Sequence, residues 1–327
     1  MSYSKKITII GGGTGTYVVT SGLKQHDFDL TKIVTVFDNG GSSGRLRDEF
    51  GFLPVGDLRQ SLAALAQENG KSWIRELLLY RFNKGTGLTG HNLGNLILTA
   101  LQDMTGSTPK ALEVAAKIFR LKGLVLPITT DQADLKITYT DGATAVGEDV
   151  LDDPSFGGKT ITKLESTTSC QLHPASRQAM LETDYIIIGP GDLYGSILPN
   201  FIVAGAKDAI QQTEAKIIYI VNLMTRYTQT HNLTAQGHVN LIQQYTGRWP
   251  DYTIVNNGKI DPDIAKLYAK QFEFPVVDDL STQSDSVLRE ALASPVKVEK
   301  KAGDSLPRSL MRHDQEKLTQ TLLKILT

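Results

Sequence analysis

The sequence predicts an α/β fold: a doubly wound, mostly parallel, Rossmann-like sheet that carries an antiparallel β insertion. Three short apolar runs support this prediction, because each is typical of a buried strand that breaks into glycines. These runs are Lys6 to Ile10, Ile33 to Phe37 and Tyr185 to Ile188. Helical patterns lie between the strands, and sheets of this kind bind ligands at the carboxyl ends of their strands. We therefore look for ligand-binding residues among those that directly follow each strand.

Further helices and strands are predicted in order from the spacing of apolar residues. The first crossover helix is expected at Thr16 to Lys24, and Asp57 is a candidate cap near the start of the next helix. Helical spacing predicts helices at Asp57 to Gln67, Trp73 to Phe82, His91 to Met104, Pro109 to Phe119 and His313 to Leu326. Two more strands are expected at Lys216 to Val221 and Tyr252 to Val255.

The pattern changes from helical to alternating between Gly123 and about Leu164, which predicts the β insertion at about 123–164. Within it, Leu135 to Tyr139 followed by Asp141-Gly142 is typical of a strand and a hairpin turn. No linker or internal repeat interrupts the chain. Residues 1–327 are therefore predicted to form one domain, with Lys297 to Ser305 as a polar surface loop.

The composition is ordinary for a globular protein, with 40% apolar and 21% charged residues. The formal net charge is −1, so no global basic field predicts nucleic-acid binding. Cys170 is the one cysteine, which excludes an internal disulfide and a cysteine-rich zinc site. The N-terminal apolar run is too short for a signal peptide, and no run approaches the length of a membrane span. We expect a cytoplasmic protein.

The first two strands end in glycine-rich loops suited to phosphate groups. Glycine lets backbone N–H groups come close to a ligand, and the positive end of a following helix favours an anion. The loops are neither a dinucleotide fingerprint, because Thr16 stands where its last small residue belongs, nor a P-loop. The alternative is two tight turns without a ligand. The candidate ligand residues are Gly11, Gly12, Gly13, Thr14, Gly15, Asp38, Asn39, Gly40, Gly41, Ser42 and Ser43.

A third strand end and two asparagines add candidates. Gly189, Pro190 and Gly191 can hold a second phosphate or a sugar, or form an ordinary turn. Asn92 and Asn95 are spaced to share one helix face. They can hydrogen-bond a base, sugar or phosphate, or cap the preceding loop.

Charged and titratable residues complete the candidates. His91 is either a general acid or base or a structural histidine, and because no nucleophile–base pair is recognisable, no catalytic residue is predicted. Four arginines can balance phosphate charge: Arg45, Arg47, Arg59 and Arg312. An acidic stretch is expected to be solvated insertion surface, with a metal site as the alternative: Asp131, Asp134, Glu148, Asp149, Asp152 and Asp153.

Together, these motifs resemble the YvcK/CofD-like family over nearly the whole chain. The matching stretches are Gly11 to Gly15, Asp38 to Arg47, Gly56 to Arg59, Gly90 to Leu96, Gly189 to Gly191, Asn222 to Thr225 and Arg312-His313. The resemblance implies a CofD-like fold and a regulatory protein that binds a nucleotide sugar, such as UDP-N-acetylglucosamine, and affects gluconeogenesis and cell shape. The alternative is the family's other branch, a 2-phospho-L-lactate transferase acting on a deazaflavin alcohol. Members of that branch tend to carry an acidic pair where this chain has Gly41 to Ser43.

The resemblance also implies roles for individual residues. The first two glycine loops would cradle the diphosphate and ribose, and directional hydrogen bonds would come from Asn92, Asn95 and Asn222. Tyr268 would stack on the uracil base, its alternative being a helix-surface tyrosine, and Arg312 would bind phosphate, its alternative being a surface arginine. Mg²⁺ accompanying the diphosphate and a homodimer are both compatible with the resemblance. No protein ligand for a metal is predicted.

Two positions depart from the family pattern. Asp192 stands where the third loop usually has Ser, and Arg226 begins a segment that usually reads Gln-Pro-Gly-Glu-Thr. A carboxylate at Asp192 would weaken phosphate binding unless a metal or an arginine offsets its charge.

Overall fold

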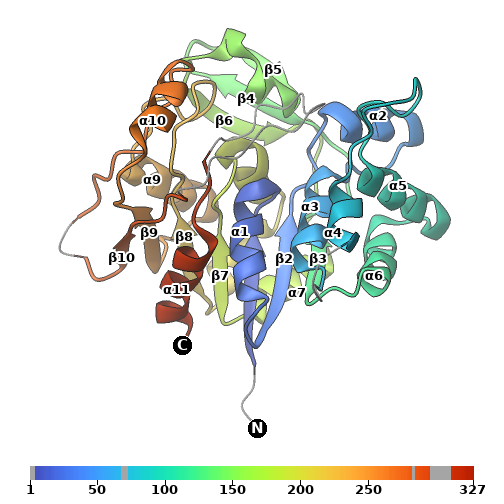
Figure 1. Cartoon of the computed structure of the whole chain (residues 1–327), viewed down its shortest axis with the longest axis horizontal. Coiled ribbons are helices and arrows are strands. Elements are labelled where there is room, and N and C mark those ends of the chain that lie inside the picture. Colours follow the sequence, from blue (N-terminus) through green and yellow to red (C-terminus); the bar gives the residue numbers. More distant parts are fainter. Residues whose placement is uncertain (1–3, 68–72, 282–283, 295–310) are drawn as a thin grey trace.

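The main sheet of the computed structural model has seven parallel strands. The structure describes residues 4–67, 73–281, 284–294 and 311–327, so the predicted loop at Lys297 to Ser305 lies outside it. The strands are β1 (Lys5–Ile10), β2 (Phe28–Val34), β3 (Leu124–Pro127), β7 (Tyr185–Ile188), β8 (Lys216–Ile220), β9 (Tyr252–Asn256) and β10 (Val287–Glu290). Their order is β10-β9-β8-β7-β1-β2-β3 (Figure 1), which confirms the α/β class.

The strand order reverses at β1, which pairs with β2 on one side and β7 on the other. Ile10, the last residue of β1, lies level with Ile33 of β2 and Ile188 of β7. The three glycine-rich segments that follow these strands therefore leave the same edge of the sheet together. This reversal point is where doubly wound sheets form their ligand crevice.

Helices cover both faces of the main sheet (Figure 1). One face carries α1 (Gly13–Leu23), α3 (Gly56–Leu65), α4 (Trp73–Leu79), α5 (Leu93–Thr105), α6 (Thr108–Ile118) and α11 (Gln315–Leu326). The other carries α7 (Pro174–Leu181), α8 (Ala206–Gln212) and α9 (Ala235–Thr246). Alternation along β7 shows why its sequence is continuously apolar: Ile187 packs into one core, and Ile186 and Ile188 into the other.

The insertion is a three-stranded antiparallel sheet placed above the carboxyl ends of the main strands (Figure 1). It contains β4 (Leu135–Tyr139), β5 (Thr144–Val146), β6 (Ile161–Ser166) and two short turns, η1 (Asp149–Asp152) and η2 (Pro154–Phe156). The predicted start near Gly123 was too early, because β3 pairs with β2 in the main sheet. A four-residue apolar strand does not carry enough periodicity to assign it to one sheet or the other.

Two helices begin inside the glycine loops, earlier than predicted. Helix α1 starts at Gly13 rather than Thr16, and α2 (Gly41–Phe50) occupies part of the segment expected to be loop. Gly41 has a φ of 50°, a left-handed conformation that glycine adopts without a steric cost. The glycine loops are thus short turns that lead directly into helix N-termini.

Other helix bounds differ by a few residues at their ends, and the expected cap at Asp57 was wrong. The N-cap of α3 is Val55, and Asp57 lies within the first turn. The helix expected at Pro199 is the single turn η4 (Leu198–Asn200), and the helices not predicted from sequence include α10 (Pro262–Ala269) and η3 (Leu193–Ile197).

Substituting Gly15 tests the contact between α1 and the third loop. A Cβ at Gly15 would collide with the backbone carbonyl of Pro190, so Gly15→Ala should lower the free energy of unfolding by about 1–3 kcal/mol. Denaturant melts measure this change. The control is Gly87→Ala, where a Cβ meets no atom within 4 Å and the expected change is below about 0.5 kcal/mol. Equal stability of the two variants would show that α1 can shift away at little cost.

Candidate functional site

A cavity of about 530 Å³ lies at the reversal point of the sheet, between the glycine loops and the insertion. Fourteen of the predicted ligand residues line it: Gly13, Thr14, Gly15, Asp38, Gly40, Gly41, Ser42, Ser43, Asn95, Pro190, Gly191, Asn222, Tyr268 and Arg312. Five do not reach its wall: Gly11, Gly12, Asn39, Asn92 and Gly189. The sequence therefore located the cavity, while the role of each residue has to be read from its contacts.

The N-terminus of α1 already holds an anion from the protein itself. The Gly13 N–H donates to Asp57 Oδ1 at 2.8 Å, and the Asp57 carboxyl fills the space that a Cβ of Gly12 would need. Burial, and then the charge of Asp38, raise the pKa of Asp57 to about 6. Asp57 therefore takes the Gly13 donor in this structure, and phosphate binding by the first loop stays a prediction.

The N-terminus of α2 presents its backbone to the cavity. Gly40 precedes it and no side chain caps its first turn, so the N–H groups of that turn have no intrahelical acceptor. Ser42 and Ser43 belong to this turn, and both line the cavity. Asp38 Oδ1 accepts from the Gly40 N–H at 3.0 Å. The N–H groups of the first turn after Gly40 are open donors at the positive end of the helix dipole, where an anion can bind.

Ser42 also contacts a histidine that the sequence did not connect with it. The distance from Ser42 Oγ to His91 Nδ1 is 3.2 Å, and the Asn92 N–H donates to the same Oγ at 3.3 Å. Burial, followed by the charge of Arg45, lowers the pKa of His91, which favours a neutral ring. Because 49 residues separate the two in the chain, no local motif could have shown the pair.

The two asparagines of the Gly90 to Leu96 motif have different roles. Asn92 lies outside the helix as the N-cap of α5, where its side chain accepts from the Asn95 N–H. Asn95 faces the cavity, and its Nδ2 donates to Ser43 Oγ at 3.3 Å. Its buried Oδ1 has no hydrogen-bond partner in the described part of the chain. The expectation of one shared helix face is therefore wrong for Asn92, and Asn95 is the member of the pair with an open acceptor.

Asn222 and Asn39 both hold neighbouring backbone in place. Asn222 accepts from the Gly191 N–H at 3.1 Å and donates to the Gly191 carbonyl at 2.8 Å, so it fixes the third loop. Asn39 Oδ1 accepts from the Asp149 N–H of the insertion at 2.9 Å. Each shapes the cavity through the backbone that it holds.

The two departures from the family pattern turn out to be one interaction. Arg226 Nη1 lies 3.2 Å from Asp192 Oδ2, and Arg226 Nη2 lies 2.6 Å from Asp152 Oδ1 in the insertion. Gln229 Nε2 donates to Asp192 Oδ2 at 2.9 Å. The negative charge of Asp192 is thus offset by an arginine, and the same arginine fastens the insertion to the third loop.

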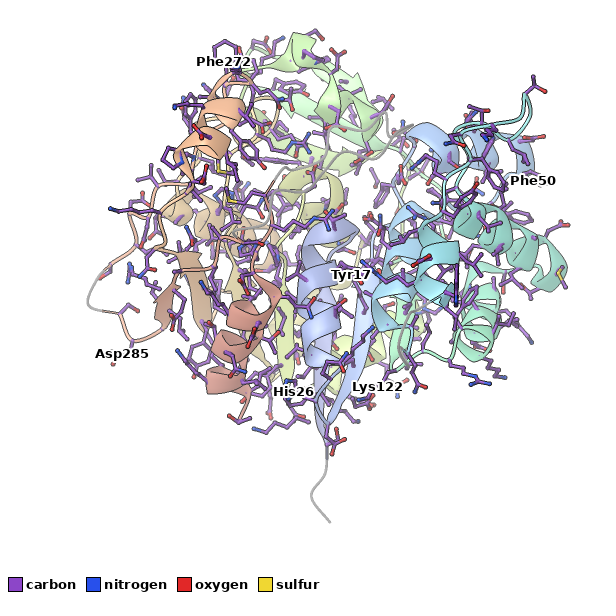
Figure 2. All side chains as sticks on the ribbon, in the orientation of Figure 1. Tyr17, His26, Phe50, Lys122, Phe272 and Asp285 are labelled. Carbon is purple, nitrogen blue, oxygen red and sulfur yellow. The ribbon has the colours of Figure 1, made fainter. Side chains whose placement is uncertain are left out.

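Neighbouring residues strengthen this attachment of the insertion. Thr228 Oγ1 donates to the Leu151 carbonyl at 2.5 Å, and Gly158 N–H donates to the Tyr227 carbonyl at 2.9 Å. The ring of Tyr227 lies 4.9 Å from that of Phe272, which Figure 2 shows near the insertion, just after α10. The segment from Arg226 to Gln229 therefore anchors the roof of the cavity.

Half of the acidic stretch faces the cavity, which corrects the expectation of a solvated surface. Glu148, Asp149 and Asp152 line the wall, and Asp134 makes a 2.5 Å ion pair with Arg47. In the described part of the chain, no group of three or more His, Cys, Asp or Glu side chains is arranged to hold a metal. Mg²⁺ arriving with a diphosphate stays a prediction.

One part of the cavity wall, away from the glycine loops in the sequence, is mainly apolar. Tyr268 is buried beside Leu223, Met224 and Met311, and its hydroxyl accepts from the Met311 N–H at 3.0 Å. The ring is therefore part of the cavity wall and not of the helix surface. Arg312 follows Met311 and lines the same end. Stacking of a base on Tyr268 stays a prediction.

These features define a Rossmann-like α/β protein whose cavity lies at the switch point of the sheet under a β insertion. The family model described as 2-phospho-L-lactate transferase CofD matches residues 7–296. The chain therefore belongs to the YvcK/CofD-like family. No helix in the described residues is long and apolar enough to cross a bilayer.

Two relatives and a solved structure are similar to this chain over almost its whole length. It is 36% identical to the "Gluconeogenesis factor" of Bacillus subtilis, over 100% of this chain and 99% of that protein. It is 41% identical to the "Putative gluconeogenesis factor" of Nostoc sp., over 98% of this chain and 68% of that protein. A crystal structure of a UPF0052 family member from Bacillus halodurans superposes with a TM-score of 0.87 at 32% identity, covering 99% of this chain and 100% of the other.

Removing the Arg226 charge tests its pairing with Asp192. Arg226→Met leaves Asp152 and Asp192 without their cation, so the free energy of unfolding should fall by about 1–3 kcal/mol. Denaturant melts provide the measurement, with Lys266→Met as the control because its ion pair is exposed and worth less than about 0.5 kcal/mol. Adding Asp192→Asn to Arg226→Met should recover part of the loss. If the double variant lost as much free energy of unfolding as the sum of the two single variants, Arg226 and Asp192 would not be coupled.

Proposed function

We propose that the protein binds a nucleotide sugar, such as UDP-N-acetylglucosamine, and acts in the cytoplasm as a regulatory protein of the gluconeogenesis-factor type that affects carbon metabolism and cell shape. One observation carries the proposal: a single cavity joins the uncapped N-terminus of α2 to the apolar wall around Tyr268. A nucleotide has the matching parts, an anionic phosphate group and a flat, largely apolar base. The names of the relatives support the regulatory role.

The contacts of the cavity support one orientation of the ligand. The diphosphate takes the first-turn N–H groups of α2, because Asp57 occupies the corresponding donor of α1. The base lies towards Tyr268, Met224 and Met311. The ribose lies between these ends, and the sugar extends beyond the outer phosphate. The hydroxyl groups of both can donate hydrogen bonds to the carboxylates and amides of the cavity wall.

A different ligand and a different activity receive less support. The first loop lacks the dinucleotide fingerprint, so NAD is not the ligand that we propose. Phospholactyl transfer is the activity named in the family description. However, residues 41–43 carry no acidic pair, and we propose binding without turnover.

Thermal denaturation with candidate ligands tests the proposal. UDP-N-acetylglucosamine should stabilise the protein by about 2.7 kcal/mol at a hundredfold excess over its Kd, because it binds only the folded state. NAD at the same concentration should leave the melting temperature unchanged. Stabilisation by NAD and not by the nucleotide sugar would refute the proposal.

A carboxylate placed at the α2 N-terminus should compete with the phosphate. Ser42→Asp is expected to weaken binding of UDP-N-acetylglucosamine at least about tenfold. In the ligand-free protein the helix dipole favours the new carboxylate and the neighbouring carboxylates oppose it, so the variant should stay folded. Calorimetric titration and denaturant melts give the two values. Ser107→Asp is the matched control, because Ser107 is the N-cap of α6, outside the cavity. Unchanged affinity of Ser42→Asp would place the phosphate elsewhere.

A further inference from the structure

Glu148 projects from the insertion towards two of the glycine loops. Its Oε1 lies 2.9 Å from the point that a Cβ of Gly195 would occupy, and its Oε2 lies 3.9 Å from that of Gly40. Gly40 immediately precedes α2, and Glu148 lines the cavity. The carboxylate is therefore adjacent to the helix N-terminus at which we place the diphosphate.

No cation is in contact with the carboxylate of Glu148. In the part of the chain that the structure describes, no hydrogen bond or ion pair reaches this carboxylate. Arg226 is near enough for its pKa to be raised in part by the charge of Glu148, but its closer ion-pair partners are Asp152, Asp192 and Glu273.

Other carboxylates surround Glu148. Burial, and then the charges of Asp38, Asp192, Asp57 and Asp152, raise its pKa well above the usual range. The raised pKa means that Glu148 carries its full charge only in alkaline solution. There, bringing another negative charge to this position costs free energy, because the surrounding carboxylates are like charges in a partly desolvated site.

The geometry points to Glu148 as a specificity-determining residue that selects a diphosphate esterified at its outer phosphate and rejects one with a free terminal phosphate. This inference rests on the proposed nucleotide-sugar function. An ester at the outer phosphate removes one ionisable oxygen, so UDP-glucose carries one negative charge fewer than UDP above the second phosphate pKa of about 6. The carboxylate thus excludes the free nucleotide while a neutral sugar group can remain beside it.

Titration calorimetry of the full chain with UDP-glucose and UDP tests this inference, without divalent cations and in alkaline buffer, above both the second phosphate pKa and the raised pKa of Glu148. The wild-type protein should bind UDP-glucose at least about tenfold more tightly than UDP. Glu148→Gln keeps the size of the side chain and removes its charge. This variant should lower the ratio at least about fivefold, and it should do so by binding UDP more tightly.

Two further arms separate charge from other roles. Glu165→Gln is the control, because Glu165 lies on β6 of the insertion, pairs with Lys163 and is outside the cavity lining; it should keep the wild-type ratio. A fall in the Glu148→Gln ratio caused by weaker UDP-glucose binding would make Glu148 a sugar contact and overturn the inference. An unchanged ratio would also overturn it and leave the proposed function standing. Absence of UDP-glucose binding by the wild type would overturn the inference, and absence of both UDP-glucose and UDP-N-acetylglucosamine binding would refute the proposed function as well.

Discussion

The hydrogen bond from the Gly13 N–H to the buried carboxylate of Asp57 organises the centre of this protein. It joins the first loop to α3, and a hydrogen bond from Ser196 brings the third loop to the same carboxylate. Lys32 on β2 is fully buried and interacts with the same carboxylate. Burial lowers the pKa of Lys32 to about 7, and the negative charge of Asp57 partly opposes this shift. The carboxylate of Asp57 thus connects the first loop, the third loop and α3, on which it lies. Its occupation of α1 leaves α2 as the open helix N-terminus for a ligand.

Much of the fold was predictable because the information is local. Buried parallel strands are continuously apolar, and both faces of β7 are indeed covered. The glycines after β1, β2 and β7 correctly marked the edge where the cavity lies. The start of the insertion was misjudged, and α2 was missed, because its first turn is Gly41-Ser42-Ser43-Gly44. These are poor helix formers, and only the packing of the whole fold makes this segment a helix.

The candidate site was predictable in place but not in detail. The pairings of Gly13 with Asp57, Ser42 with His91, and Arg226 with Asp152 each join residues far apart in the chain. Hydrogen bonds of this kind leave no periodic signal in the sequence, since either partner alone has an ordinary explanation. Asp192 illustrates the limit: taken alone, it suggested a weakened anion site, and only the fold shows that Arg226 offsets its charge.

The Asp192–Arg226 pair restricts the order in which this part of the molecule can change. An aspartate introduced first would place an unbalanced charge beside Glu148, whereas an arginine introduced first would still meet Asp152 and Glu273. In the second route the single intermediate keeps its arginine paired with these two carboxylates, so we expect it to be the less costly one. The two positions are consequently epistatic. To introduce the usual family residues into this protein, Arg226 and Asp192 would have to be replaced together, or Asp192 first. Replacing Arg226 first would leave the Asp192 carboxylate without its arginine beneath the insertion.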